Sequence, residues 1–400
     1  MIKILNNFKH IVKKHNLIII YLMIVVVLIY GAARTSGTDH LSKIILHGLS
    51  ALFFYISIYL FTKKILKNKA SSIIDKISLP HKFAQILGIL SCTQIIIHLI
   101  SLGGSPAIEA LSIYTTEEVS ALRNSITENA SSLTNYLSSI NIRGILPFLI
   151  LYFLIKKDRK FYYLILFLGI FYSFSLMQKS YIVTVLLPTL IYCSIKLKWG
   201  YIFKHTIIIG FTVVSLVYIA SPTPSKQVKP DENDITYRSD IPLVNVLYGI
   251  QKRMFEVPGE IVSKWFDNIP KNKPFLNGRG YRFITVITGE EYVRYDAELY
   301  PIIRPNYAEQ GYTGTVNTAS FMYDYANFGI LGLIISGFFI SLFIIIIELI
   351  YIGNMAIKLS LNLFHIALLS SAAITTLAFS GGWIFLIILY LLFLRNYSKP

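Results

Sequence analysis

The hydrophobic positions of this chain fall into long runs separated by short charged turns, and one long polar stretch divides the early runs from the late ones. A helix needs about 20 apolar residues to cross a bilayer, and about ten runs approach that length. The pattern therefore predicts an all-α, polytopic membrane helix bundle. The predicted spans cover residues 17–30, 44–62, 83–101, 144–155, 161–177, 181–195, 205–220, 327–350, 359–379 and 382–394.

The polar stretch gives three predicted domains. Residues 1–220 form an N-terminal transmembrane bundle of about seven spans, and residues 327–400 carry about three more. Residues 221–326 between them form a large extracytoplasmic loop that holds most of the acidic residues. We expect the active-site region in this loop, because spans that face lipid carry few polar groups.

Composition excludes an ordinary soluble protein. The chain is 54% hydrophobic and 14% charged, whereas soluble proteins carry about 25% charged residues. Roughly 20 of the 37 Lys+Arg flank the helix ends assigned to the inner side, which predicts that both termini are cytoplasmic. The net charge of +16 does not indicate nucleic-acid binding, because the long loop is nearly neutral and lacks a clustered basic excess.

Two stretches of the loop have recognisable local patterns. From Ile241 to Phe266 the apolar positions follow helical spacing, with a break at Pro258. Further on, two glycines flank Arg279 in Asn277-Gly-Arg-Gly-Tyr-Arg282. Such glycines would let backbone N–H groups and the arginine approach an anion closely, and the alternative is a flexible turn.

Basic residues also stand at helix ends that the topology assigns to the outer side, where they are uncommon. They either extend to lipid phosphates or form a basic rim for a phosphorylated lipid substrate. These residues are Arg34, Lys43, Arg143 and Lys179. Both cysteines lie in apolar runs and no metal-ligand spacing appears, so we expect neither a metal nor another cofactor.

Taken together, these features resemble the bacterial O-antigen polymerase family, the Wzy-type oligosaccharide repeat-unit polymerases. The resemblance covers the topology of the whole chain, and its motifs lie mainly within residues 250–332. The matching pieces are Arg253-Met-Phe with Pro258, Trp265 through Pro274, Gly278, Asn317-Thr-Ala-Ser320, Phe328-Gly-Ile-Leu-Gly332 and the turn from Ser175 to Ser180. The related O-antigen ligases carry a histidine near the position of Val316, and no histidine lies in this loop.

The resemblance implies a glycosyltransferase with a GT-C-like helical fold at the outer face of the bacterial cytoplasmic membrane. A glycan linked to undecaprenyl pyrophosphate is transferred to the non-reducing end of another lipid-linked unit. Arginine or lysine would stabilise the departing pyrophosphate, and a carboxylate would act as base for the acceptor hydroxyl. The expected substrate-binding residues are Arg253, Arg279, Arg282, Lys179, Arg143 and Asn317, and the candidate bases are Glu309 and Asp324.

Other functions stay open. A lipid-linked oligosaccharide flippase or another transporter would place ionisable residues inside its spans and keep its loops short, whereas the predicted spans are nearly free of charge. An O-antigen ligase would be expected to carry the missing histidine. The family further implies a chain-length regulator and a flippase as partners, together with the membrane and the lipid-linked glycan.

Overall fold

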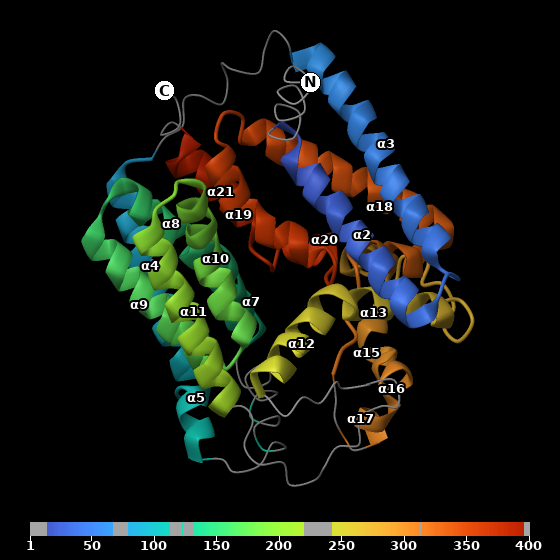
Figure 1. The fold of residues 1–400 in the computed structure, drawn as a ribbon, viewed down its shortest axis with the longest axis horizontal. Coiled ribbons are helices and arrows are strands. Elements are labelled where there is room, and N and C mark those ends of the chain that lie inside the picture. The colour runs from blue at the N-terminus through green and yellow to red at the C-terminus, as the bar shows by residue number, and fades with distance from the viewer. Residues whose placement is uncertain are drawn as a thin grey trace. The chain divides into compact units, whose positions relative to one another are not determined.

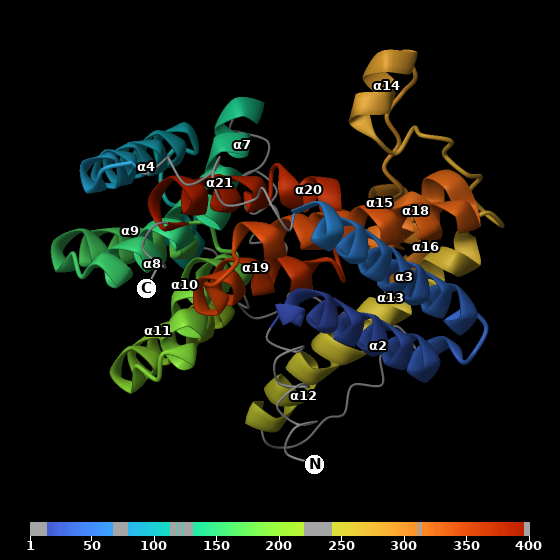
Figure 2. The same ribbon diagram turned by 90° about the horizontal axis from the view of Figure 1, so that it is seen from above.

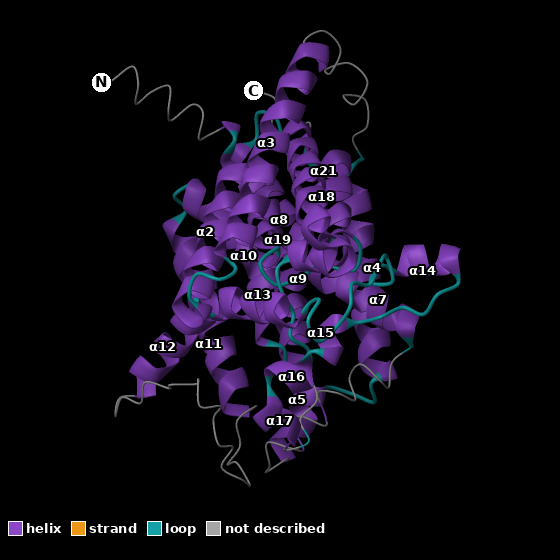
Figure 3. Cartoon of the chain, turned by 90° about the vertical axis from the view of Figure 1, so that its right-hand side faces the viewer, coloured by secondary structure: helices purple, strands orange, loops and turns teal. Residues whose placement is uncertain are grey.

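The computed structural model describes residues 14–66, 79–112, 118, 122, 131–219, 242–309, 311 and 314–395, and it contains helices but no strands in these ranges (Figure 3). Within them, seven helices are long and apolar enough to cross a membrane. The prediction of an all-α membrane protein is confirmed at this level. The seven are Asn16–Ser36, Leu41–Lys63, His81–Ser101, Ser132–Lys156, Trp199–Leu216, Ser320–Ile350 and Ile374–Phe393.

The chain divides into two compact units, each built from segments far apart in the sequence. Unit 1 comprises residues 1–68, 228–348 and 366–374, and unit 2 comprises residues 69–227, 349–365 and 375–400. The first two spans therefore belong to the same unit as the polar segment, and the spans that follow them in sequence belong to the other unit. The predicted domain boundaries describe the order of segments along the chain, which differs from this grouping in space.

Unit 1 combines three membrane helices with a series of shorter ones (Figure 1). The membrane helices are α2 (Asn16–Ser36), α3 (Leu41–Leu66) and α18 (Ser320–Ile350), of which unit 1 includes the part up to Glu348. The shorter helices are α12 (Pro242–Phe255), α13 (Val257–Asn268), α14 (Arg282–Thr288), α15 (Tyr295–Glu298), α16 (Tyr300–Ile303) and α17 (Pro305–Glu309).

Small residues hold the helices of unit 1 close together. Where α13 crosses α2, a Cβ on Gly259 would lie 2.4 Å from Leu28 O, so only glycine fits. A Cβ on Gly337 of α18 would lie 2.1 Å from Ser50 Oγ of α3, and Ser341 Oγ donates to Ala51 O over 2.6 Å. Such contacts let backbones pack directly in a membrane, where lipid tails compete with larger apolar side chains.

The helical pattern predicted around Pro258 is confirmed. Helix α12 ends at Phe255, and α13 begins at Val257 with the proline in its first turn, where a missing N–H costs nothing. The short stretches after α13 are fixed by buried contacts. Trp265 is fully buried and its Nε1 donates to Val316 O over 3.2 Å, which joins α13 to the segment before α18.

Two late helices differ from the sequence prediction. Helix α18 begins at Ser320, seven residues before the predicted span at 327, because Phe321, Met322 and Tyr325 are buried with helical spacing. The span predicted at 359–379 is interrupted between α19 (Met355–Leu368) and α20 (Ile374–Ala378). The break is hydrogen-bonded to the start of α18: Ser320 N donates to Leu369 O, and Ile374 N donates to Ser320 Oγ.

Unit 2 is organised around α8 (Leu146–Lys156), in which every residue from Leu146 to Ile155 is buried. The π-helical turn η3 (Asn141–Ile145) joins α8 to α7 (Ser132–Ile140), so this span is longer than predicted. The remaining helices are α4 (His81–Ser101), α5 (Pro106–Glu109), η2 (Ala110–Ser112), α9 (Arg159–Ser175), α10 (Lys179–Ile195), α11 (Trp199–Ile219) and α21 (Trp383–Phe393).

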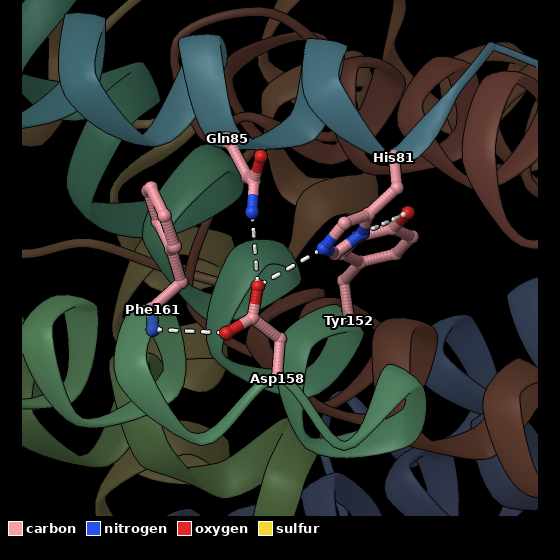
Figure 4. A network of polar contacts seen from close by, with 5 residues as sticks. All are labelled: His81, Gln85, Tyr152, Asp158 and Phe161. Atoms are coloured by element: carbon pink, nitrogen blue, oxygen red, sulfur yellow. Dashed lines mark hydrogen bonds and ion pairs between the residues drawn. The ribbon is translucent and has the colours of Figure 1, made fainter.

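A polar network closes the turn between α8 and α9 (Figure 4). Asp158 caps α9 by accepting from Phe161 N over 3.3 Å, and it also accepts from His81 Nε2 over 2.9 Å and Gln85 Nε2 over 3.1 Å. Burial raises the pKa of Asp158, but these hydrogen bonds lower it more, so the pKa lies below its ordinary value of 3.8. The network fixes the start of α4 against this turn.

Candidate functional site

The candidate site in unit 1 lies where α18 is broken. Gly329 has φ 60° and ψ −140°, a conformation that is not helical and that residues other than glycine rarely adopt. A break at this position leaves carbonyls of the preceding turn without their helical partners. Two of them accept from the loop after α13: Leu276 N donates to Ala326 O over 2.9 Å, and Asn277 N donates to Asn327 O over 3.0 Å.

Asn327 completes the attachment of this loop. Its buried side-chain oxygen accepts from Gly278 N over 3.1 Å and from Gly280 N over 3.0 Å, while its Nδ2 donates to Tyr323 O over 2.8 Å. A Cβ on Gly280 would lie 2.5 Å from Asn327 Nδ2, so glycine is required for the approach. We call the segment Leu276–Tyr281 the glycine loop.

This geometry corrects the interpretation of the Gly-Arg-Gly sequence as a backbone anion site. The N–H groups of Gly278 and Gly280 are bound to Asn327, and Arg279 N donates to Leu276 O over 3.0 Å. None of these three donors is available to an anion in this arrangement. The glycines are needed for close contact with α18, and any anion contact falls to the Arg279 side chain.

A carboxylate on α18 faces the end of the glycine loop. The hydroxyl of Tyr281 donates to Asp324 Oδ1, and its ring stacks on Phe328 with centroids 6.1 Å apart. Asp324 is half-buried. Burial and then the charge of Asp324 raise the pKa of Tyr281 above its ordinary range, so the tyrosine is the donor of this pair.

The two arginines of this region, Arg279 and Arg282, differ in burial and in their contacts. Arg279 is half-buried, and its Nε donates to Leu276 O over 3.3 Å, which leaves the outer guanidinium nitrogens for other partners. Arg282 is exposed at the start of α14, and its guanidinium lies over the Tyr292 ring, 5.0 Å from the centroid. Of the predicted site residues, Arg279, Arg282 and Asp324 are thus brought to the glycine loop or its contact with α18.

Other predicted residues of unit 1 lie on different elements and are exposed. Arg253 is in the last turn of α12, Glu309 is the last residue of α17, and Asn317 is in the extended segment before α18. Glu309 is exposed to solvent, whereas Asp324 is half-buried.

Two predicted residues belong to unit 2. Arg143 lies on η3, and its guanidinium is 5.5 Å from the centroid of the Tyr181 ring. Lys179 is the first residue of α10, the helix that also carries Tyr181 and packs against η3. The two basic positions therefore come from neighbouring elements of one unit.

Sequence reasoning missed several polar contacts in unit 1. The main one is the attachment of the glycine loop to Asn327. A polar amide two residues before Gly329 in a mostly apolar helix was the sequence signal for such a contact. His47 of α3 is buried inside a span: its Nδ1 donates to Leu333 O over 2.9 Å, and it is hydrogen-bonded through Nε2 to the Tyr21 hydroxyl. Isolated histidines in apolar runs mark such buried polar contacts.

The described residues were also compared with the requirements of a metal site. No group of three or more His, Cys, Asp or Glu side chains that could hold a metal ion occurs among the described residues. The fold and the intramembrane polar groups define a helical membrane protein. Comparisons with protein-family models, with curated proteins and with solved structures found no match.

Proposed function

We propose that this protein is a polymerase of undecaprenyl-pyrophosphate-linked oligosaccharide repeat units, which makes O-antigen, capsule or another exopolysaccharide. The growing glycan is transferred to the non-reducing end of a new lipid-linked unit. The acceptor hydroxyl attacks the anomeric carbon of the donor, the bond from that carbon to the pyrophosphate oxygen breaks, and lipid pyrophosphate leaves. The acceptor's proton passes to a base.

The observation that carries the proposal is the Asp324–Tyr281 pair at the end of the glycine loop, which also holds Arg279. It joins a half-buried carboxylate of a membrane helix to the glycine loop, which carries Arg279 and is followed directly by Arg282. In the proposed reaction the acceptor hydroxyl replaces the Tyr281 hydroxyl as the donor to Asp324, which takes its proton. Arg279 and Arg282 stabilise the charge that develops on the leaving pyrophosphate. Glu309 is the weaker candidate base because it is exposed.

The rest of the proposal follows the family resemblance. The protein lies in the bacterial cytoplasmic membrane with both termini in the cytoplasm, about ten spans in a GT-C-like arrangement, and its large loop in the periplasm. Lys179, Arg143, Arg253 and Asn317 contribute further substrate contacts. A chain-length regulator and a flippase are the proposed protein partners.

A transporter of lipid-linked oligosaccharides is the second candidate, and one observation favours it. Helix α18 carries two carboxylates within its apolar length, because Glu348 also lies on it and accepts from the Tyr55 hydroxyl. Ionisable residues inside spans are typical of transport pathways. The sequence predicts Asp324 in the loop, so the nearly charge-free predicted spans argued against a transporter, whereas the structure puts Asp324 on α18.

The surface glycan profile of a deletion strain distinguishes these functions. The strain is complemented with wild type, Arg279→Ala, Asp324→Asn or the exposed-residue control Lys271→Ala, and the level of each protein in the membrane is measured. Loss of polymerase activity leaves a single repeat unit on the lipid acceptor. We expect this pattern for Arg279→Ala and Asp324→Asn, and a normal ladder for Lys271→Ala.

Other patterns would contradict the proposal. Absence of any repeat unit at the surface in the deletion strain would favour the transporter or a ligase. A normal ladder in the deletion strain would exclude all three functions. A normal ladder with Asp324→Asn alone would remove this carboxylate from the reaction and leave the polymerase proposal with Arg279.

A further inference from the structure

Helix α14 turns its apolar side away from the rest of unit 1. Phe283, Val286 and Ile287 are 60%, 83% and 82% exposed, and their spacing puts them on one face of the helix. The opposite face is fixed to the glycine loop, since Thr285 is buried and Ile284 lies against Gly278. The exposed apolar face therefore cannot be hidden by rotating the helix.

The base of α14 is held at one end of a membrane helix. The glycine loop that precedes α14 is bound to Asn327, and Tyr281 is bound to Asp324, both within the first third of α18. The break at Gly329 divides α18, and residues 330–350 after it form a helix about 30 Å long, close to the thickness of the hydrocarbon core. Asp324 O lies against Gly332 near the start of this segment, so α14 starts at the level of the membrane interface.

Aromatic contacts connect the exposed face of α14 to α18, which also carries exposed apolar side chains. Ile330 and Leu331 are 58% and 60% exposed on that helix. The ring of Tyr281 bridges the two elements, with its centroid 6.1 Å from Phe328 of α18 and 5.6 Å from Phe283 of α14. Figure 2 shows α14 standing clear of the other elements of unit 1.

Polar residues mark the edge of this apolar face. Arg282 stands at the first position of α14 with its guanidinium over Tyr292, and Glu290 and Glu291 follow the helix as exposed carboxylates. Arginine and tyrosine at the boundary of an apolar surface are typical of membrane interfaces, where aromatic rings sit at the headgroups and long cationic side chains reach phosphate.

We propose that α14 is an interfacial membrane helix, with Phe283, Val286 and Ile287 inserted among the lipid acyl chains and Arg282 at the headgroups. An apolar face at interfacial depth gains its stability from lipid instead of from protein packing. The lipid contact holds the glycine loop at the membrane surface, and it does not depend on the chemistry proposed for Asp324.

The depth of a label on α14 tests the proposal. Cys92 and Cys193 are replaced by serine, Ile287→Cys is labelled with an environment-sensitive fluorophore, and the full-length protein is placed in vesicles of phosphatidylethanolamine and phosphatidylglycerol. Lipids with brominated acyl chains should quench the label at position 287 at least about twofold more than a label introduced with the control Glu290→Cys. Aqueous iodide should show the opposite preference.

Two results would overturn it. Equal lipid quenching at the two positions, with iodide reaching both, would show that α14 faces water. Protection of position 287 from both quenchers, together with energy transfer between labelled molecules that falls on dilution into excess lipid, would show that a second copy covers the face. The thermal midpoint of each labelled variant in detergent is compared with that of the cysteine-free parent, so that only folded protein is scored.

Discussion

At Asn327 one side-chain oxygen accepts from two backbone N–H groups, that of the buried Gly278 and that of the half-buried Gly280. Water cannot replace this acceptor easily, because Asn327 is 1% exposed. Each buried donor that loses its partner costs about 1–3 kcal/mol, so this side chain contributes strongly to the glycine loop, beside the backbone bonds to Ala326 O and Asn327 O. This attachment also helps to hold Tyr281 against Asp324.

Replacing Asn327 with alanine should lower the free energy of unfolding by about 2–4 kcal/mol, because two hydrogen bonds from backbone donors and the amide bond to Tyr323 O are lost. The matched control is Asn277→Gly. Asn277 is an exposed asparagine of the same loop with φ 50°, a conformation that glycine adopts readily, so we expect little change. Thermal unfolding in mild detergent measures both, and equal losses would contradict the role of the side-chain oxygen.

Asp158 gives a pH-dependent prediction at the same scale. Its pKa is lower in the folded protein than its ordinary value of 3.8, so its stabilising contribution is present above that value and is lost as the pH falls through the folded pKa. Wild type should exceed Asp158→Asn by about 1 kcal/mol at neutral pH, since asparagine keeps the helix cap but loses the charge. The gap should shrink when the midpoints are measured below about pH 4, and a constant gap would refute this.

At the scale of elements, α18 is two helical segments joined at Gly329. The break converts two helix carbonyls into acceptors for Leu276 N and Asn277 N, which a continuous helix could not offer. Broken membrane helices occur where protein surrounds the freed backbone groups. Here the glycine loop provides that protection.

The residue at the break should tolerate no side chain. Gly329→Ala forces alanine into φ 60° and ψ −140°, with a Cβ 3.1 Å from Phe275, and should destabilise the protein by about 1–3 kcal/mol. Gly210→Ala is the control, because Gly210 lies within α11 with open space around its Cβ position and should not lose stability. If both variants melt at the wild-type temperature, the break is not a fixed feature of the folded protein.

At the scale of the molecule, unit 1 joins the first two spans to segments more than 160 residues later. The contact of α2 with α13 is a direct backbone approach at Gly31 and Gly259, and α3 meets α18 at Ser50 and Gly337. These contacts form between the helices themselves, so they do not depend on a covalent link between residue 68 and the rest of the chain.

A split chain should therefore assemble. A tagged fragment 1–68 and an untagged fragment 69–400, expressed together, should copurify from membranes in detergent. Gly259→Leu in the longer fragment should reduce recovery by about tenfold or more, because its side chain would collide with the backbone of α2. Recovery that is unaffected by Gly259→Leu would mean that the fragments associate through some other surface.

The sequence predicted the membrane helices well where length and hydropathy decide the structure. Helices α2, α3 and α4 include the predicted runs, and Pro258 marks the start of α13 as expected. It did not reveal the pairing of the glycine loop with Asn327, because residues 47 to 49 positions apart share no periodic pattern. The early start of α18 was hidden by polar residues such as Asp324, whose partner Tyr281 comes from elsewhere in the chain.

The break at Gly329 also sets an order of events during synthesis. Residues 276–280 leave the ribosome about 50 residues before Asn327, and until α18 is in place the N–H groups of Leu276, Asn277, Gly278 and Gly280 lack their acceptors. The glycine loop is therefore completed only after the next span has been inserted, at about 5–20 residues per second. The contact of Tyr281 with Asp324 thus marks the protein as assembled, and an uninserted α18 leaves the loop without its acceptors.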